Sequence, residues 1–234
     1  KYTRGVRLLG GCILALAGTL NMSLFPILGS KFVVGFTGLG MEYVKPVMIA
    51  MLVVVVVYTL MGGMVSVVLT DFAQFILLTV GFLLGTYFIL AHPDLGWSNI
   101  VSSLETHKGV IAFDPIANID YGWIFIFYFV SVSFIGLVWQ PEMSRPLSTE
   151  DSRVARRIFW IQGLTSVGRA VIPMFWGIAA FAYTRLPSYT GGYAEDGQTA
   201  MPEMMGQILP IGVAGLLLAG MFAAFMSTHD SYLL

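Results

Sequence analysis

Residues Val44–Leu60 read VKPVMIAMLVVVVVYTL, a run in which Lys45 is the one charged side chain. About 20 apolar residues in a helix cross the hydrocarbon core of a bilayer, so this run is close in length and composition to a transmembrane segment. Similar blocks occur on both sides of it, and the whole chain is 57% hydrophobic and only 11% charged. A soluble domain carries about 25% charged residues. The sequence therefore predicts an integral membrane protein, whose helices contact the lipid bilayer.

Six apolar blocks are long enough to be candidate transmembrane helices. They are Arg7–Gly29, Val44–Leu60, Val65–Leu90, Trp123–Trp139, Ile158–Thr184 and Ile208–Ser231. None alternates apolar and polar residues in the way that barrel strands do, which favours helices. We expect an all-α membrane protein, a helical bundle in which residues 1–234 form a single transmembrane domain.

Composition also bears on partners and chemistry. The formal net charge is −1 and no basic patch suits a phosphate backbone, so nucleic acid is not an expected partner. The single cysteine, Cys12, lies in an apolar block and leaves no internal disulfide. The sequence contains no phosphate-binding loop, no HExxH zinc motif and no Cys–His metal set. We therefore expect a protein that is not an enzyme.

Lys and Arg residues predict the orientation of the helices, because they concentrate on the cytoplasmic side. Alternate threading of the six blocks places seven of them on one side: Lys1, Arg4, Arg7, Arg145, Arg153, Arg156 and Arg157. The other side receives Lys31, Lys45, Lys108 and Arg185. This predicts a cytoplasmic N-terminus and a tight cytoplasmic turn at Gly62–Gly63. It also predicts two outer loops with room for short helices, His92–Tyr121 and Leu186–Met205.

The last block carries polar residues within an apolar helix, in the run AAFMSTHDS that ends at Ser231. At about 100° per residue, one narrow face holds Ala224, Ser227, Thr228 and Ser231, and Asp230 lies beside Ser227. Polar groups within a membrane helix usually face the bundle interior and mark an ion or substrate path. Oxygen atoms on such a face suit a hard cation. His229 points away from this face, and we expect it to be structural or at the surface.

Beyond the first two residues of each predicted helix, three charged side chains lie inside these helices: Asp71, Arg169 and Asp230. Asp71 lies between Thr70 and Gln74 within one helical turn, and the predicted topology places it in the same cytoplasmic half as Asp230. Two carboxylates at similar depth, with the hydroxyls of the last helix, form a plausible oxygen cage. The alternative for each is an acid at the membrane interface. Arg169 is expected either to bind a substrate carboxylate or to form a structural ion pair between helices.

Three stretches resemble the sodium:solute symporter family, the sodium-coupled transporters of sugars, proline, iodide and sialic acid. They are YTLMGGMVSVVLTDFAQ (Tyr58–Gln74), WQPEMSRPLSTEDSRVARR (Trp139–Arg157) and LLLAGMFAAFMSTHDSYL (Leu216–Leu233). The first is similar to the family's GG turn and the TD segment that follows it. The second is similar to its cytoplasmic loop, which begins with QP and ends with ARR. The third is similar to its AAxMSTxDSxL signature. The resemblance implies ten core helices in two inverted repeats, as in the leucine-transporter fold. This chain would hold core helices three to eight, as an interior piece without the first, ninth and tenth.

The resemblance also implies ligands for the coupling ion, Na⁺. The last predicted helix matches half of the conserved sodium site, which takes the carbonyl of Ala224 and the hydroxyls of Ser227 and Thr228. A second sodium site, described in some members of the family, corresponds to Asp71, Ser227, Asp230 and Ser231.

The expected function is sodium-coupled symport of a small organic solute by alternating access, in the plasma membrane or in the inner membrane of a bacterium. The family's sugar transporters carry an Asn and a gating Tyr where this chain reads VSVSFI at 130–135, which disfavours a sugar. Gln140 lies in a QP pair similar to members that transport proline and carboxylates, so Gln140 and Arg169 are candidate contacts to a carboxylate-bearing solute. Two alternatives stay open. One is proton-coupled symport with Asp71 or Asp230 as the carrier, and the other is a transporter-like sensor module of a signalling kinase.

Overall fold

The computed structural model describes residues 3–114, 116, 122–136, 139, 143, 146–191 and 197–233, without the side chains of 62–69, 110–111, 125, 133, 135–136, 230–231 and 233. Every regular element in these residues is a helix. The chain divides into two compact units, Lys1–His92 with Pro187–Leu234 and, between them in sequence, Pro93–Leu186. Within the described residues, five helical segments are long and apolar enough to cross a membrane, which confirms the predicted all-helical membrane class.

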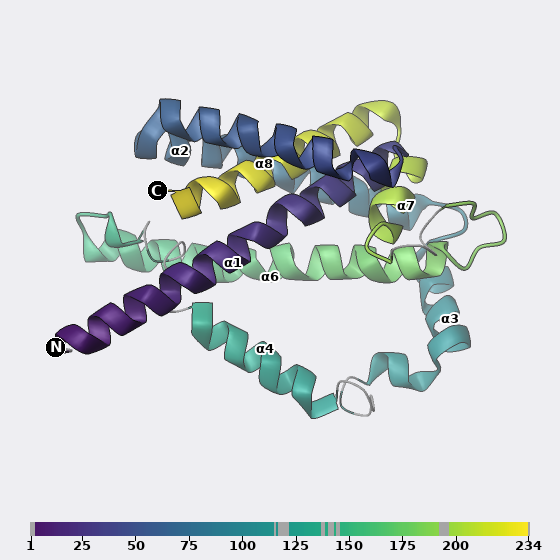
Figure 1. The fold of residues 1–234 in the computed structure, drawn as a ribbon. Coiled ribbons are helices and arrows are strands. Elements are labelled where there is room, and N and C mark those ends of the chain that lie inside the picture. The colour runs from purple at the N-terminus through teal and green to yellow at the C-terminus, as the bar shows by residue number, and fades with distance from the viewer. Residues whose placement is uncertain are drawn as a thin grey trace. The chain divides into compact units, whose positions relative to one another are not determined.

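The first unit contains α1 (Arg4–Thr37), the short η1 (Met41–Tyr43), α2 (Val44–Ala91), α7 (Ala200–Ile208) and α8 (Ile211–Leu233) (Figure 1). α1 begins where the Thr3 hydroxyl accepts a hydrogen bond from the Val6 amide at 3.4 Å. It ends at Gly38, whose φ of 71° is left-handed and whose amide donates to the carbonyl of Gly35. Glycine adopts this conformation without a Cβ clash, so it stops the helix cleanly. α1 therefore continues beyond the predicted limit at Gly29.

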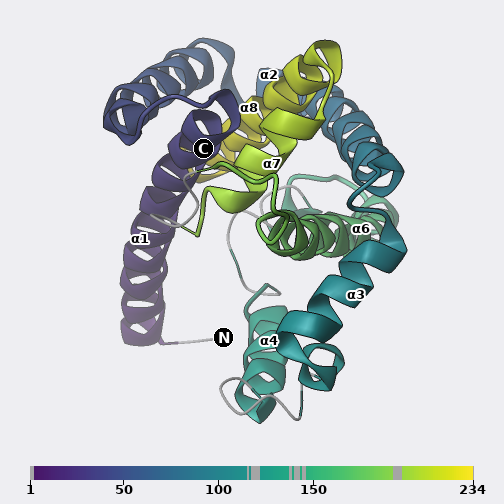
Figure 2. The same cartoon turned by 90° about the vertical axis from the view of Figure 1, so that its right-hand side faces the viewer.

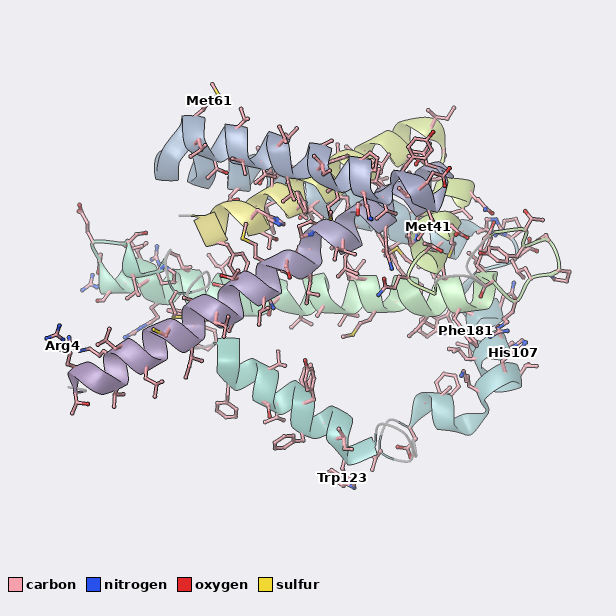
Figure 3. All side chains as sticks on the ribbon, in the orientation of Figure 1. Arg4, Met41, Met61, His107, Trp123 and Phe181 are labelled. Atoms are coloured by element: carbon pink, nitrogen blue, oxygen red, sulfur yellow. The ribbon has the colours of Figure 1, made fainter. Side chains whose placement is uncertain are left out.

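α2 has a helical backbone from Val44 to Ala91, yet the chain reverses direction within it. The hydroxyls of Tyr58 and Thr70 are hydrogen-bonded to each other, whereas a straight helix would separate these two residues by about 18 Å. The reversal therefore lies between them, in the range that contains the predicted turn. It divides α2 into a first arm, residues 44–61, and a second arm, Thr70–Ala91. In Figure 3, Met41 and Met61 lie near opposite ends of the first arm.

α8 packs along the second arm of α2 (Figures 1 and 2). A Cβ atom on Gly220 would lie 3.5 Å from the Cα of Leu78, and one on Gly81 would lie 3.7 Å from the Cα of Leu217. Glycines allow the two backbones to approach this closely, as is common between membrane helices. The two pairs show that α8 and the second arm run antiparallel.

A small buried core joins α1, the first arm of α2 and α8. It consists of Val33, Met51, Val55 and Phe225. Further along the same contact, the Tyr232 hydroxyl donates to Asn21 Oδ1 at 2.8 Å, which ties the end of α8 to α1. α8 is therefore held between α1 and both arms of α2, and its faces have fixed neighbours.

The described part of the second unit contains α3 (Trp97–Lys108), the short η2 (Val110–Phe113), α4 (Gly122–Gly136) and α6 (Ser152–Tyr183). α6 begins where the Asp151 carboxylate accepts a hydrogen bond from the Arg153 amide at 2.8 Å, a favourable N-cap. α3 lies against α6, where the rings of Trp97 and Phe175 stack with centroids 6.2 Å apart. α4 overlaps the predicted block Trp123–Trp139 and begins one residue before it. α3 and most of α7 fall within the predicted outer loops.

Candidate functional site

Ser227 and Thr228 interrupt the apolar sequence of α8. The Thr228 hydroxyl donates to the carbonyl oxygen of Ala224 at 2.8 Å, the usual contact of a threonine inside a helix. This bond occupies the hydroxyl proton and leaves the lone pairs of the Thr228 oxygen available to accept a further contact. Both residues are half-buried. Ser227 and Thr228 therefore place two uncharged hydroxyl groups side by side on α8.

The contacts of α8 define which of its faces meets α2. Leu217 and Gly220 contact the second arm. Successive residues of an α-helix are rotated by about 100° around its axis. With this rotation, Leu217, Gly220, Ala224 and Ser227 all lie within one sector of about 80°. Ala224 and Ser227 therefore face the second arm of α2.

The second arm shows the matching face. Leu78 and Gly81 contact α8, and Asp71 and Gln74 lie on the same side of the helix, within about 80° of them. The polar residues of the second arm and of α8 therefore face one another across a single helix–helix contact.

The register of this contact sets the depth of each polar residue. Moving along α8 from residue 217 to residue 220 moves the contact back along α2 from residue 81 to residue 78. The same antiparallel register, continued at about 1.5 Å per residue, brings Gln74 level with Ala224 and Asp71 level with Ser227. This supports the expectation that the Asp71 carboxylate and the hydroxyls of α8 lie at similar depth.

The oxygens on the second arm are shielded from water. Asp71 Oδ1 and Gln74 Oε1 are both buried atoms, and Gln74 Oε1 accepts no hydrogen bond within the described part of the chain. A buried oxygen without a donor costs about 1–3 kcal/mol. A cation at the level of Gln74 would offset that cost, because the amide oxygen could coordinate it.

His229 lies on the opposite side of α8. It is fully buried, and its Nδ1 atom lies 2.9 Å from the Phe225 carbonyl oxygen. The edge of its ring packs against Phe25 of α1 with centroids 6.2 Å apart. Of the two expected roles, structural or surface, the structural one is therefore confirmed by burial.

The structure does not bring the remaining candidates to this contact within the residues that it describes. Asp230 and Ser231 continue the helix of α8, but their side chains lie outside the described residues, as does the whole of Gln140. Arg169 lies on α6 in the second unit, where its side chain is exposed.

Tyr58 is a residue that the sequence alone does not single out. Its hydroxyl bonds the hydroxyl of Thr70, the residue before Asp71, and so fixes the start of the second arm. The sequence signal that could have identified Tyr58 is its spacing from the predicted turn. Two residues that lie equally many positions before and after a helical reversal can meet across it.

Within the described residues, no group of three or more His, Cys, Asp or Glu side chains is placed to hold a metal ion. The oxygens gathered between α8 and the second arm are instead hydroxyl, carbonyl, amide and one described carboxylate. Such ligands suit a hard cation.

Comparison of the sequence with known proteins identifies its family. The sequence matches the model of the sodium:solute symporter family over residues 3–234. The high affinity choline transporter 1 of Mus musculus is 24% identical over 190 residues, which are 77% of this chain and 32% of that transporter. No solved structure matches the chain.

Two bacterial relatives are also similar to it. The sodium/sialic acid symporter NanT of Aliivibrio fischeri is 27% identical over 93% of this chain and 45% of its own length. The sodium/sialic acid symporter SiaT of Proteus mirabilis is 29% identical over 81% of this chain and 40% of its own length. The chain thus spans less than half the length of these relatives.

Proposed function

The chain belongs to the sodium:solute symporter family, and on that premise we propose that the full-length protein is a sodium-coupled symporter of a small organic solute. The chain is an integral membrane protein with several helices able to cross a bilayer. We place it in the plasma membrane, or in the inner membrane of a bacterium. The names of the two sialic acid symporters support coupling to Na⁺. The six predicted blocks would then correspond to core helices three to eight of an inverted-repeat transporter.

One observation carries the proposal: the face of α8 that packs on the second arm of α2 is the face that bears Ala224 and Ser227. We assign the first sodium site to the Ala224 carbonyl and the hydroxyls of Ser227 and Thr228. The hydrogen bond between Thr228 and Ala224 supports this assignment, because it holds two of the three oxygens together. Ligands from other helices would complete the coordination shell.

We assign the second sodium site to Asp71 with Ser227, Asp230 and Ser231. The shared depth of Asp71 and Ser227 supports it, and so does the burial of Asp71 Oδ1. Gln74, one turn further along the second arm, has its amide oxygen at the level of Ala224 and could serve the first site.

These ligands suit an ion that must bind and leave again. Neutral hydroxyl and carbonyl oxygens bind Na⁺ modestly, and a nearby carboxylate lowers the cost of a cation in a low-dielectric interior. Coupling requires that the ion and the solute stabilise the same conformation, by a reciprocal free energy of about 1–3 kcal/mol. Loss of Na⁺ to a sodium-poor cytoplasm would then weaken solute binding and release the solute inward.

For the solute, we propose a small carboxylate-bearing molecule, with Arg169 and Gln140 as its candidate contacts. The side chain of Arg169 is exposed on α6 and carries the positive charge that a carboxylate needs. Among the relatives, the names of NanT and SiaT include an acid, sialic acid, whereas that of the mouse transporter gives choline.

The test is uptake by the full-length protein in proteoliposomes, with an inward sodium gradient or with potassium in its place. A panel of labelled carboxylates, zwitterions and choline identifies the solute in the same assay. We expect accumulation of one of them to require sodium. Equal accumulation without sodium would contradict the proposal.

Proton coupling is the second candidate, and the burial of the Asp71 carboxylate oxygen favours it. A buried carboxylate can exchange a proton instead of binding a cation. Uptake driven by a pH gradient alone, and abolished by Asp71→Asn, would replace sodium coupling with this mechanism.

A further inference from the structure

The second unit contains a polar pocket that the sodium sites do not use. Its volume is about 350 Å³, and it lies between α3 and the end of α6. Its lining includes Asp94, Asn99, Ser103, Ala182 and Arg185. The predicted topology places this end of α6 on the extracytoplasmic side. Pockets of about 300–1,000 Å³ are typical of sites for small molecules.

Local packing holds the walls of the pocket in place. Leu95 and Ile100 are buried, with 0% and 2% of their surfaces exposed. The Asn99 side-chain amide donates to the Pro93 carbonyl oxygen at 3.1 Å, which fixes the turn that leads into α3. The pocket is therefore formed by a packed segment and not by loose side chains.

Phe181 orients the cation of the pocket. The Arg185 guanidinium lies over its ring, 4.9 Å from the centroid, and Lys108 Nζ lies 5.7 Å from the same centroid. His107 meets the ring edge-on, with centroids 6.2 Å apart, and Figure 3 shows His107 and Phe181 close together. Cation–π contacts of this kind hold a charged group in place without neutralising it. Of the two cations over Phe181, only Arg185 is among the pocket-lining residues.

The pocket combines opposite charges with an unsatisfied hydroxyl. Asp94 and Arg185 both line it. Ser103 Oγ, also in the lining, is buried and makes no hydrogen bond within the described part of the chain. A buried polar atom without a partner calls for a specific explanation, such as a bound ligand or water. Ala182 and Leu186 add an apolar wall.

We propose that this pocket is a binding site for a small zwitterion of the α-amino acid type. Arg185 would bind the carboxylate and Asp94 the ammonium group, and Ser103 would form part of the wall beside them. The hydrocarbon part of the ligand would rest on Ala182 and Leu186. The site goes beyond the proposed sodium-coupled transport and does not depend on it, because none of its residues belongs to the sodium sites.

The test uses L-proline and two half-ligands, cyclopentanecarboxylate and pyrrolidine. Saturation-transfer NMR measures their binding to the full-length protein in nanodiscs, in sodium-free potassium buffer so that sodium-dependent binding is suppressed. We expect L-proline to bind at millimolar concentration and each half-ligand to bind about tenfold more weakly, because each loses one charged contact. Failure of L-proline to bind, or equal binding by a half-ligand, would overturn the proposal.

Matched variants locate the binding. Arg185→Gln and Asp94→Asn should each weaken L-proline binding about tenfold. Two control variants change charges outside the pocket lining. Lys108→Gln removes the other cation over Phe181, and Glu105→Gln removes a nearby acid. Both variants should bind L-proline as tightly as the wild type does. Size-exclusion elution confirms that each variant is folded. If Arg185→Gln and Lys108→Gln bind equally, the assignment of the pocket is wrong.

A further variant separates this site from transport. Ser227→Ala alters the proposed sodium site and should leave sodium-free binding of L-proline unchanged. Loss of that binding in Ser227→Ala would place the ligand at the transport site and overturn the inference. Sodium-independent uptake would overturn the proposed function, whereas it would leave this result unaffected.

Discussion

Thr228 donates its hydroxyl proton to the carbonyl oxygen of Ala224, 2.8 Å away and one turn earlier in α8. The bond joins two of the three oxygens assigned to the first sodium site. A change at Thr228 therefore alters its own ligand atom and the position of a second one.

The first prediction concerns the hydroxyl of Thr228. Thr228→Val keeps the shape of the side chain and removes the oxygen, so the sodium concentration for half-maximal uptake should rise about tenfold, the cost of one hydrogen bond to a charged group. Thr228→Ser keeps the hydroxyl and serves as the control, with a smaller shift. The measurement is uptake against sodium concentration in proteoliposomes. An unchanged sodium requirement in Thr228→Val would exclude this residue from the site.

The second prediction concerns the charge of Asp71. Asp71→Asn keeps the size of the side chain and removes the charge, which should weaken sodium binding and bring the Hill coefficient for sodium closer to one. Asp151→Asn is a matched control, because Asp151 caps α6 and belongs to neither sodium site. Sodium dependence is measured at two external pH values. A sodium response identical to that of the wild type would remove Asp71 from the account.

The third prediction concerns the hydrogen bond between Tyr58 and Thr70 across the reversal of α2. Tyr58→Phe and Thr70→Val should each lower the free energy of unfolding by about 1 kcal/mol. The double variant should lose less than the sum, because both changes remove the same bond. Thermal unfolding in detergent measures all three. Strict additivity would show that the two hydroxyls do not interact.

The fourth prediction concerns the packing of α7 on α1. A Cβ atom on Gly206 would overlap the carbonyl oxygen of Phe36, whereas one on Gly212 would meet nothing within 4 Å. Gly206→Ala should therefore destabilise the protein by about 1–3 kcal/mol, the usual cost of overpacking. Gly212→Ala should unfold at the wild-type temperature or slightly above it. Equal unfolding temperatures for the two variants would show that α7 does not approach α1 in this way.

The sequence predicts the membrane class, and it suggests much of the proposed sodium site, because both depend on local pattern. Hydropathy indicates helices long enough to cross a bilayer, and helical spacing places Ala224 and Ser227 on one face of α8. The depth of Asp71 follows from counting residues after the predicted turn, and the register between α8 and the second arm supports it.

Other features depend on contacts between distant segments, which local pattern does not reveal. The buried His229 ring contacts Phe25, which lies more than two hundred residues earlier in the chain. Hydropathy does not predict the extension of α1 beyond Gly29, because Ser30 and Lys31 resemble the polar end of a membrane helix. The backbone continues there until Gly38, where a left-handed residue stops it. The pairing of Tyr58 with Thr70 depends on where α2 reverses, and hydropathy alone does not fix that point.

The central claim is that α8 binds the coupling ion through its small polar face. Equilibrium binding of radioactive sodium to the purified full-length protein tests it most directly, with the wild type compared with Ser227→Ala and with Ser166→Ala. Ser166 lies on α6, bonds the Gly163 carbonyl and belongs to neither sodium site. The account predicts that Ser227→Ala loses most sodium binding at concentrations that saturate the wild type, and that Ser166→Ala keeps it. Sodium binding by Ser227→Ala equal to that of the wild type would contradict the account.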